Sequence, residues 1–382
     1  MLSKLIPNSI RTQIRSRWFK SWVLEGRSHG CSDVLRVLSG GVPPPDKAYI
    51  SKCLFDNNVR EYYKGRKMKW MTAATARRFQ CELSITPTGG FAGYSQSDSY
   101  EYLIPKWVTA EVELTQEDVY GGRSKSRRRD LRQLARNSLR YELTTDKQSL
   151  LWFYDNMYLP TMKSSHGDGA ILRRRDQILQ RVEEGKCELL IVKQKQHRIA
   201  GSLIAYDEEI PRLWGSGIRA ADRRYLRLGA GNAVYLFSFQ HLLQSGYRRV
   251  NIGLSRAFLS DGAMYFKRRL GISLTKASRD VFAIRFSKPS AALRSCLSAI
   301  PFVCVDGSEL HAAVFVSSDY LRDSASWRAI WDKNYLPGIK KLIVNAFHDT
   351  RSVSDISVPS NIPSQMELRC IDISPIRESD SE

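Results

Sequence analysis

One stretch of the chain, residues 211–272, constrains the fold more than any other. It reads as a strand, a turn rich in arginine and glycine, an apolar helix, a second strand and a short basic helix: Arg212–Arg219, Ala220–Asn232, Ala233–Gln244, Arg249–Ser255 and Asp261–Gly271. In strand–helix–strand units, the first N–H groups of the helix lack intrahelical partners and favour an anion. We therefore expect this stretch to hold a phosphorylated ligand.

The charge of the whole chain supports an anionic partner. Its 382 residues carry a formal net charge of +20, which favours phosphates, nucleic acid, acidic glycans or anionic membrane surfaces without choosing among them. The chain is long enough for two domains or two related halves, and 42% hydrophobic residues suffice for a packed core.

Cysteine usage and the absence of long apolar runs predict a cytoplasmic protein. The chain has seven cysteines, an odd number, and none of them forms a CxxC pair. A disulfide framework or a zinc site is therefore not expected. No apolar run approaches the about 20 residues of a membrane helix. The basic N-terminus lacks the apolar core of a secretory signal. It is consistent with a solvated terminus or with a helix on a membrane surface.

Composition divides the chain into five segments. These are a basic N-terminal extension, an N-terminal half, a C-terminal domain, a helix/strand extension and a disordered acidic tail: 1–45, 46–145, 146–286, 287–375 and 376–382. The first ends in three prolines, Pro43–Pro45, which cannot continue a helix or a central strand. Trp107–Leu114 alternates like a half-buried strand.

A run of basic residues precedes the central stretch. Arg123–Arg140 has the composition of a helix, with leucines on one side. It is consistent with a solvated helix face or with a helix that faces an anion. Farther along, Lys147–Leu159 predicts an aromatic-rich helix, Pro160–Ala170 a polar loop, and Cys187–Lys193 with Arg198–Asp207 an antiparallel strand pair.

The end of the central stretch carries a family resemblance. The residues concerned are Gly246-Tyr247, Ile252–Ser255, Asp261-Gly262 and Phe266–Gly271. Together with the order of elements from Cys187 to Ser278, they resemble the GNAT fold of N-acyltransferases, in its FemAB-like branch with the CelD/BcsL-type acetyltransferases. The resemblance implies an α/β (α+β) fold with a GNAT-like mixed central sheet, in two tandem GNAT-like halves. It covers about Asp46–Ser278.

The glycine turn is the predicted donor site. Glycines permit close approach of a phosphate, and arginines supply charge and paired donors. The predicted cofactor-binding residues are Arg224, Arg227, Gly229, Ala230, Gly231 and Asn232. The alternative is an ordinary glycine turn before a helix. The turn departs from the common GNAT pattern, because Leu226 occupies the position three before Gly229.

Three residues are predicted to act in catalysis. The resemblance implies a functional lysine at Lys267, which would hold a phosphate or stabilise developing charge. Tyr265 would protonate the leaving group, and His166 would act as general base on an amine. The alternatives are a solvated lysine, a packed tyrosine and an exposed histidine.

Two further residues, Ser255 and Asp261, are predicted to contact substrate, although Asp261 would equally serve as the cap of the short helix.

These patterns favour an N-acyltransferase that uses acyl-CoA, or an acyl-carrier protein, as thioester donor and needs no metal. The acceptor would be an amine on a sugar, amino acid or polyamine. A Fem-like peptidyltransferase that draws on aminoacyl-tRNA is a second hypothesis. A non-catalytic binder of nucleic acid or an anionic surface is a third.

Overall fold

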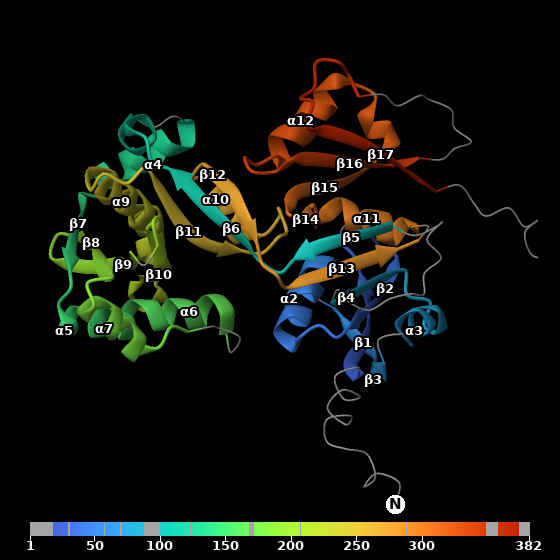
Figure 1. The fold of residues 1–382 in the computed structure, drawn as a ribbon, viewed down its shortest axis with the longest axis horizontal. Helices are drawn as coiled ribbons and strands as arrows, with labels where there is room; N and C mark the ends of the chain where they lie inside the picture. Colours follow the sequence, from blue (N-terminus) through green and yellow to red (C-terminus); the bar gives the residue numbers. More distant parts are fainter. Residues whose placement is uncertain are drawn as a thin grey trace, which may run out of the picture. The chain divides into compact units, whose positions relative to one another are not determined.

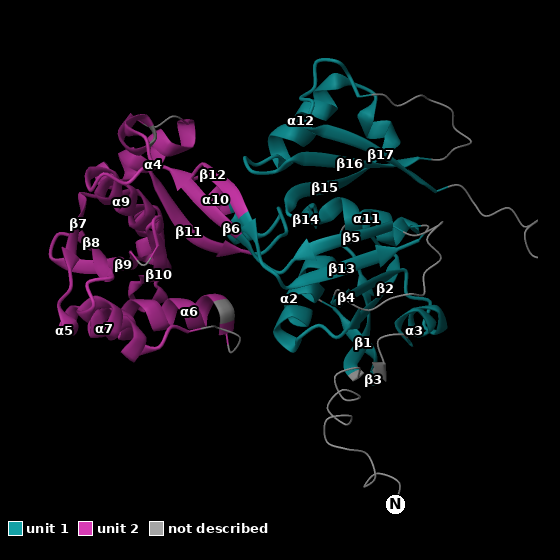
Figure 2. Cartoon of the chain, viewed as in Figure 1, with its two compact units in different colours: residues 1–108, 256–265, 276–382 teal, residues 109–255, 266–275 magenta. Residues whose placement is uncertain are grey.

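The computed structural model describes residues 18–29, 31–56, 58–68, 71–87, 100–121, 124–167, 172–206, 208–287, 289–348 and 358–373. Residues 1–17 of the predicted N-terminal extension, and the whole predicted tail 376–382, lie outside this part of the chain. The described chain packs into two compact units (Figures 1 and 2). Unit 1 comprises residues 1–108, 256–265 and 276–382, and unit 2 comprises residues 109–255 and 266–275.

Unit 2 is built on a seven-stranded mixed sheet with the order β12-β6-β11-β10-β9-β8-β7. Its strands are β6 (Val108–Glu113), β7 (Leu139–Thr144), β8 (Cys187–Gln194), β9 (His197–Ala205), β10 (Arg212–Ile218), β11 (Arg249–Ser255) and β12 (Ile272–Ala277). The strands from β7 to β10 pair antiparallel in succession, whereas β10 and β11 run parallel. This confirms the predicted antiparallel pair before the central stretch.

Helices cover this sheet. They are α4 (Lys125–Arg136), α5 (Lys147–Phe153), α6 (Leu159–His166), α7 (Arg175–Glu183), α8 (Arg223–Arg227), α9 (Ala230–Gln244) and α10 (Gly262–Arg268), with π-helical turns η3 (Glu117–Gly121) and η4 (Tyr154–Tyr158). One core joins Phe153 and Met157 to Leu189, Leu203 and Trp214. The helix α9 is buried along most of its length, as its apolar sequence predicts.

The predicted polar loop at Pro160–Ala170 is wrong in its first part, because α6 extends to His166. The helix reaches this far through η4, and Pro160 sits in the first turn of α6, where its missing N–H costs little. Sequence alone did not show that a proline could continue one helix into the next.

Unit 1 contains two sheets. The first has the order β3-β1-β2-β4-β13-β5: β1 (Trp18–Arg27), β2 (Val34–Gly40), β3 (Arg60–Met68), β4 (Leu83–Pro87), β5 (Tyr100–Pro105) and β13 (Val281–Phe286). The second is β14 (Phe302–Asp306), β15 (Glu309–Ser317), β16 (Lys341–His348) and β17 (Met366–Asp372). Its helices include α2 (Pro44–Leu54), α3 (Thr72–Arg78), α11 (Ala291–Ala299) and α12 (Ser324–Asn334).

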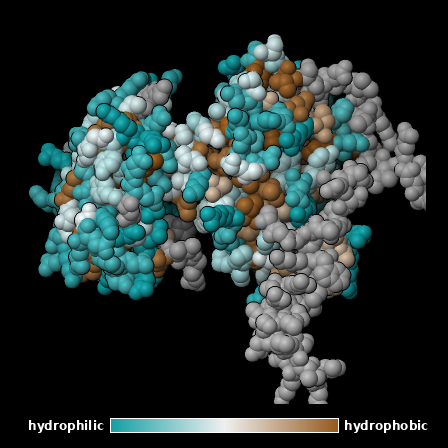
Figure 3. All heavy atoms as spheres, viewed as in Figure 1, coloured by the Kyte–Doolittle hydropathy of each residue, from teal (hydrophilic) through white to brown (hydrophobic). Residues whose placement is uncertain are grey.

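The fold class is therefore the predicted one, a mixed α/β protein with a mixed central sheet. Both the six-stranded and the seven-stranded sheet contain a parallel pair beside antiparallel ones, β2 with β4 and β10 with β11. The domain limits given from composition remain a prediction. In the view of Figure 3, the visible surface of unit 2 is predominantly hydrophilic.

Candidate anion-binding site

The start of α9 is a left-handed glycine turn. Gly229 is the N-cap residue with φ +94°, and no side chain caps the helix there. The amides of Ala230, Gly231 and Asn232 occupy the first turn, where a helix has no carbonyl to bond them. Partial positive charge therefore accumulates at this end of a 15-residue helix.

Side chains of α4 hold the turn in place. Gln133 Nε2 donates to the carbonyl of Arg227 at 2.7 Å, and Asn137 Nδ2, which follows α4, donates to the carbonyl of Leu228 at 2.8 Å. A Cβ added at Gly229 would lie 3.1 Å from the Gln133 amide carbon. Glycine is thus required at this position both by backbone conformation and by the close approach of α4.

The sequence explains why α4 presents its arginines. Ser124 caps the helix by accepting from the Arg127 amide at 3.1 Å. Leu134 is buried, and so is Arg127, whose Nη2 donates to the carbonyl of Leu270 at 3.1 Å. These buried contacts fix one face of the helix, and arginines occupy positions elsewhere on it.

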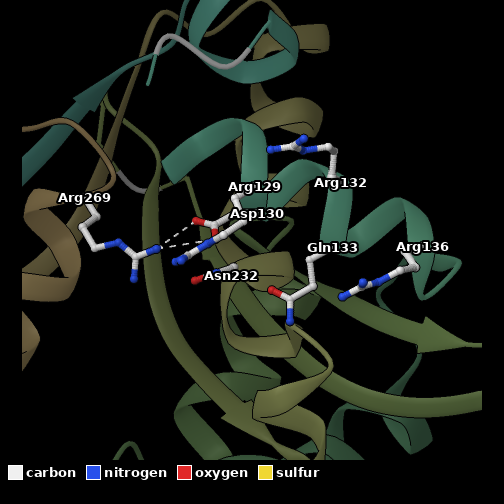
Figure 4. Close-up of a pocket in the computed structure, with 7 residues that line it drawn as sticks. All are labelled: Arg129, Asp130, Arg132, Gln133, Arg136, Asn232 and Arg269. Atoms are coloured by element: carbon white, nitrogen blue, oxygen red, sulfur yellow. Dashed lines mark hydrogen bonds and ion pairs between the residues drawn. The ribbon is translucent and has the colours of Figure 1, made fainter. Parts of the chain in front are cut away.

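A cavity of about 700 Å³ lies between α4, the first turn of α9 and the end of α10 (Figure 4). It is lined by Arg129, Asp130, Arg132, Gln133, Arg136, Asn232 and Arg269. Four guanidinium groups and a single carboxylate line it, so the lining is strongly cationic. A polyanion with several oxygens, such as a phosphate chain, fits both its size and its charge.

Side chains of α4 hold the guanidinium group of Arg269 toward the cavity. Its Nη2 donates to Ser126 Oγ at 2.8 Å and lies 3.3 Å from Asp130 Oδ2, the contact visible in Figure 4. Asp130 is itself buried. Asp130 Oδ1 also lies 4.0 Å from Arg129 Nε, so the one carboxylate of the cavity contacts two of its four arginines.

The structure brings only part of the predicted donor site to this cavity. Asn232 lines it, and Gly229 and Gly231 shape the turn beside it. Arg224 instead forms an ion pair with Asp222 at 2.7 Å, and its hydrogen bond lowers the pKa of that carboxyl. Arg224 and Arg227 are exposed and are not among the lining residues.

Most lining residues were not named from the sequence. Arg129, Arg132 and Arg136 follow a spacing of three and four residues, which places side chains on one helix face. This spacing within the basic run Arg123–Arg140 is the signal that could have identified them. It favours the anion-facing interpretation of that run over the solvated one.

The sheet opens beside this site. β10 and β11 share a single register pair, Arg212 with Asn251, although every residue of both strands is described. Beyond that pair, Gly253 has φ +80° and donates its amide to Asn251 Oδ1 at 2.8 Å. The parallel ladder is therefore limited to one register pair.

Lys267 is buried at this opening. Its side chain reaches from α10 to donate to the carbonyls of Gly253 at 3.1 Å and Leu254 at 2.8 Å. The residue is 7% exposed, so the expectation of a solvated lysine does not describe it. Its ammonium group thus satisfies two consecutive backbone carbonyls of β11.

The remaining predicted residues have distinct environments. Tyr265 in α10 is 64% exposed, and His166 is the last residue of α6. Asp261 caps α10, with Oδ1 accepting from the Ala263 amide at 2.9 Å, as predicted. Ser255 is buried at the end of β11, and its Oγ has no hydrogen-bond partner among the described residues.

No group of three or more His, Cys, Asp or Glu side chains is arranged to hold a metal ion in the described part of the chain. No helix within the same residues has both the length and the apolar content to cross a bilayer.

The sequence matches no protein-family model and no curated protein. Similar solved structures include the C-terminal domain of a lysylphosphatidylglycerol synthetase from Agrobacterium fabrum, with 13% identity and a TM-score of 0.33 over 72% of this chain and 84% of that chain. The crystal structure of FemX has 12% sequence identity and a TM-score of 0.35, over 68% of this chain and 83% of FemX. A GCN5-related N-acetyltransferase from Kribbella flavida has 8% sequence identity and a TM-score of 0.27, over 82% of this chain and 72% of that chain.

Proposed function

We propose that this chain is a transferase of acyl or aminoacyl groups whose donor is held by its phosphates in the cavity of unit 2. The observation that carries the proposal is the set of four arginines around the uncapped N-terminus of α9. Backbone amides and guanidinium groups together bind phosphate oxygens with charge-assisted hydrogen bonds.

The reaction we favour is N-acyl transfer from a thioester, carried by coenzyme A or an acyl-carrier protein, to an amine on a sugar, amino acid or polyamine. The amine nitrogen bonds to the carbonyl carbon while the carbon–sulfur bond breaks. The amine gives up its proton, and the thiolate leaving group takes one. Such a reaction requires positioning and stabilisation of the oxyanion.

The predicted roles follow this chemistry. His166 would accept the proton of the amine, Tyr265 would protonate the leaving thiolate, and Lys267 would stabilise charge. Of the predicted substrate contacts, Ser255 suits the role better than Asp261. The carboxylate of Asp261 already accepts from the Ala263 amide and from the Tyr49 hydroxyl, whereas Ser255 Oγ has no described partner.

The FemAB-like resemblance of Gly246–Gly271 and the net charge of +20 support a second candidate, transfer of an aminoacyl group from tRNA. The row of arginines on α4 would then meet an RNA backbone, whose binding weakens steeply with salt. The two donors share phosphate chemistry, so the same cavity serves either one. A cytoplasmic location is proposed for both.

Calorimetric titration with coenzyme A and with tRNA tests the proposal. Reversing two lining charges in Arg129→Glu/Arg132→Glu should weaken binding of the true donor at least thirtyfold, because two guanidinium contacts become repulsive. The matched control is Arg128→Glu, which alters an exposed charge on the same helix outside the cavity lining.

Each outcome decides between the hypotheses. Binding of coenzyme A with turnover of an amine supports acyl transfer, and binding of tRNA with RNase-sensitive turnover supports aminoacyl transfer. Salt-sensitive tRNA binding without turnover supports the non-catalytic hypothesis. If the intact protein binds neither probe and also fails to bind an acyl-carrier protein, the proposed function is wrong.

A further inference from the structure

The four-stranded sheet of unit 1 contains a strand whose edge is open along its last part. β15 pairs with β14 from Glu309 to Ala313, where β14 begins at Phe302, yet β15 continues to Ser317. On its other side it stays paired with β16 as far as Ser317. Within the described part of the chain, residues 314–317 of β15 therefore have a strand neighbour on one side only.

The backbone groups of β15 show which residues face this open edge. Successive residues of a strand direct their N–H and C=O groups to alternate sides. The Leu310 carbonyl accepts from the Lys340 amide at 2.7 Å, and the Val314 carbonyl accepts from Asn345 Nδ2 in β16 at 3.1 Å. The even-numbered residues thus point toward β16, and the odd-numbered residues point toward β14 and, beyond it, toward the open edge.

The open edge offers an acceptor and a donor two residues apart, the Phe315 carbonyl and the Ser317 amide. No described residue forms a hydrogen bond with either group. In a parallel ladder, a carbonyl and the amide two residues later hold the N–H and the C=O of a single residue in the neighbouring strand. The edge therefore matches the main chain of one amino acid.

A cavity of about 400 Å³ lies at this edge. It is lined by Phe315 and Ser317 and also by Pro301, the residue before β14, so it lies where β14 stops. Its volume is near the lower end of the range of about 300–1,000 Å³ that small-molecule sites occupy. The cavity thus suits a ligand of amino-acid size.

The lining combines apolar walls with one cation. Val314 and Val316 of β15 and Ile330 of α12 supply apolar surface, and both Val314 and Ile330 are buried. Lys333, farther along α12, is exposed and is the one charged side chain among the described lining residues. Apolar walls favour an apolar side chain, and the lysine favours a carboxylate.

We propose that this cavity of unit 1 binds a free α-amino acid with an apolar side chain. The carboxylate accepts from the Ser317 amide and meets the charge of Lys333, while the ammonium group donates to the Phe315 carbonyl. The ligand takes the place of one residue in a strand beside β15. The site does not depend on transferase activity, so its failure would leave the proposed function intact.

Ser317→Pro removes the donor alone. Ser317 has φ −66°, which proline adopts without strain, and its N–H bonds to no described residue, so the variant should melt at the wild-type temperature. In calorimetric titration of the intact protein with L-leucine, Ser317→Pro should bind at least about twentyfold more weakly, whereas the control Ser317→Ala should bind like the wild type. A Ser317→Pro protein that unfolds, or that binds L-leucine as the wild type does, would overturn the inference.

Truncated ligands test the two charged groups. Isocaproate lacks the ammonium group and isoamylamine lacks the carboxylate, so each should bind at least about tenfold more weakly than L-leucine. Lys333→Met should weaken L-leucine about tenfold and leave isoamylamine unchanged. Arg328→Met, the control, alters an exposed cation of α12 outside the lining and should change neither. Absence of L-leucine binding to the wild type at millimolar concentration, or equal binding of L-aspartate, would also overturn the inference.

Discussion

The larger sheet of each unit contains a parallel strand pair, β2 with β4 and β10 with β11, and these two pairs differ in how far their register extends. In unit 1, β2 and β4 remain in register from Val37 opposite Leu83 to Ser39 opposite Ile85. In unit 2, β10 and β11 meet at one register pair and then separate. The same local arrangement therefore forms a continuous sheet in one unit and an opening in the other.

The helices that follow the first strand of each pair differ in charge. The helix α2 begins with Pro44 and Pro45, which have no N–H to offer, and its first turn carries the buried Asp46. Asp46 accepts from Arg256 Nη1 at 2.8 Å and lies 2.8 Å from Lys106 Nζ. Unit 1 thus supplies its own carboxylate to nearby cations, whereas α9 starts with glycine beside four arginines. The second arrangement is the one that we propose receives an external anion.

The largest expected effect comes from removing the internal carboxylate of unit 1. Asp46→Ala should lower the free energy of unfolding by about 3–5 kcal/mol, because two largely buried cations lose their partner. Formate or phosphate should restore part of this loss by taking the vacant place. Chemical denaturation with and without these anions measures both effects.

The matched control is Asp319→Ala, which breaks an exposed ion pair with Arg322 in the same unit. It should change stability by no more than about 0.5 kcal/mol and show no response to anions. An Asp46→Ala protein as stable as the wild type would remove the contrast between the two helix starts.

The next prediction compares two glycines whose backbone has the left-handed conformation. Gly229 (φ +94°) and Gly41 (φ +71°) would each bring a Cβ to 3.1 Å from a neighbouring side chain, so alanine at either position should cost about 2 kcal/mol. Only Gly229→Ala should also weaken donor binding, by about tenfold, because only that turn borders the cationic cavity. Thermal unfolding and calorimetry report the two quantities. Equal loss of binding in both variants would contradict the assignment of the site to unit 2.

A smaller, pH-dependent effect is expected at the far end of α9. Burial raises the pKa of Glu188, but hydrogen bonds with His241 and Tyr206 outweigh it and lower the pKa below its usual value. A lowered pKa stabilises the folded state above the unfolded value of about 4.3, and this contribution is lost as pH falls through the folded pKa.

Glu188→Gln should therefore cost about 1–2 kcal/mol near pH 7 and progressively less below about pH 4. Urea denaturation of both proteins across this range gives the difference. Because Glu188 is remote in sequence from the α9 start and absent from the cavity lining, donor binding at pH 7 should stay unchanged. A difference that is constant with pH would contradict the role of its charge.

The smallest expected effect tests how α4 supports the turn. Asn137→Ala removes the hydrogen bond to the carbonyl of Leu228 and should cost about 1 kcal/mol and weaken donor binding about threefold. Asn156→Ala, which loses only a bond to a carbonyl of its own helical segment, is the control for a lost amide. Equal binding by both variants would show that the turn keeps its shape without Asn137.

The elements that the sequence predicted correctly are those with a local residue pattern. The apolar run at Ala233–Gln244 and the strand at Arg249–Ser255 are present as predicted, and Asp261 caps the short helix. It failed at Pro160, where a π-helical turn let the chain stay helical, because no local pattern distinguishes such a turn from a loop. The structure places three arginines of the basic run on the cavity, and their role in binding an anion remains a prediction.

The sequence by itself determined the net positive charge, the strand–helix–strand order of residues 211–272 and the glycines of the turn, because charge and backbone freedom are properties of single residues and their neighbours. Only the tertiary structure showed which of the basic side chains line the cavity. Arg269 reaches Asp130 across 139 positions of the chain, and Thr161 reaches Ile218 across 57. Such contacts depend on how helices pack on a sheet. The same packing places Lys267 next to two backbone carbonyls and places the arginines of α4 along the cavity.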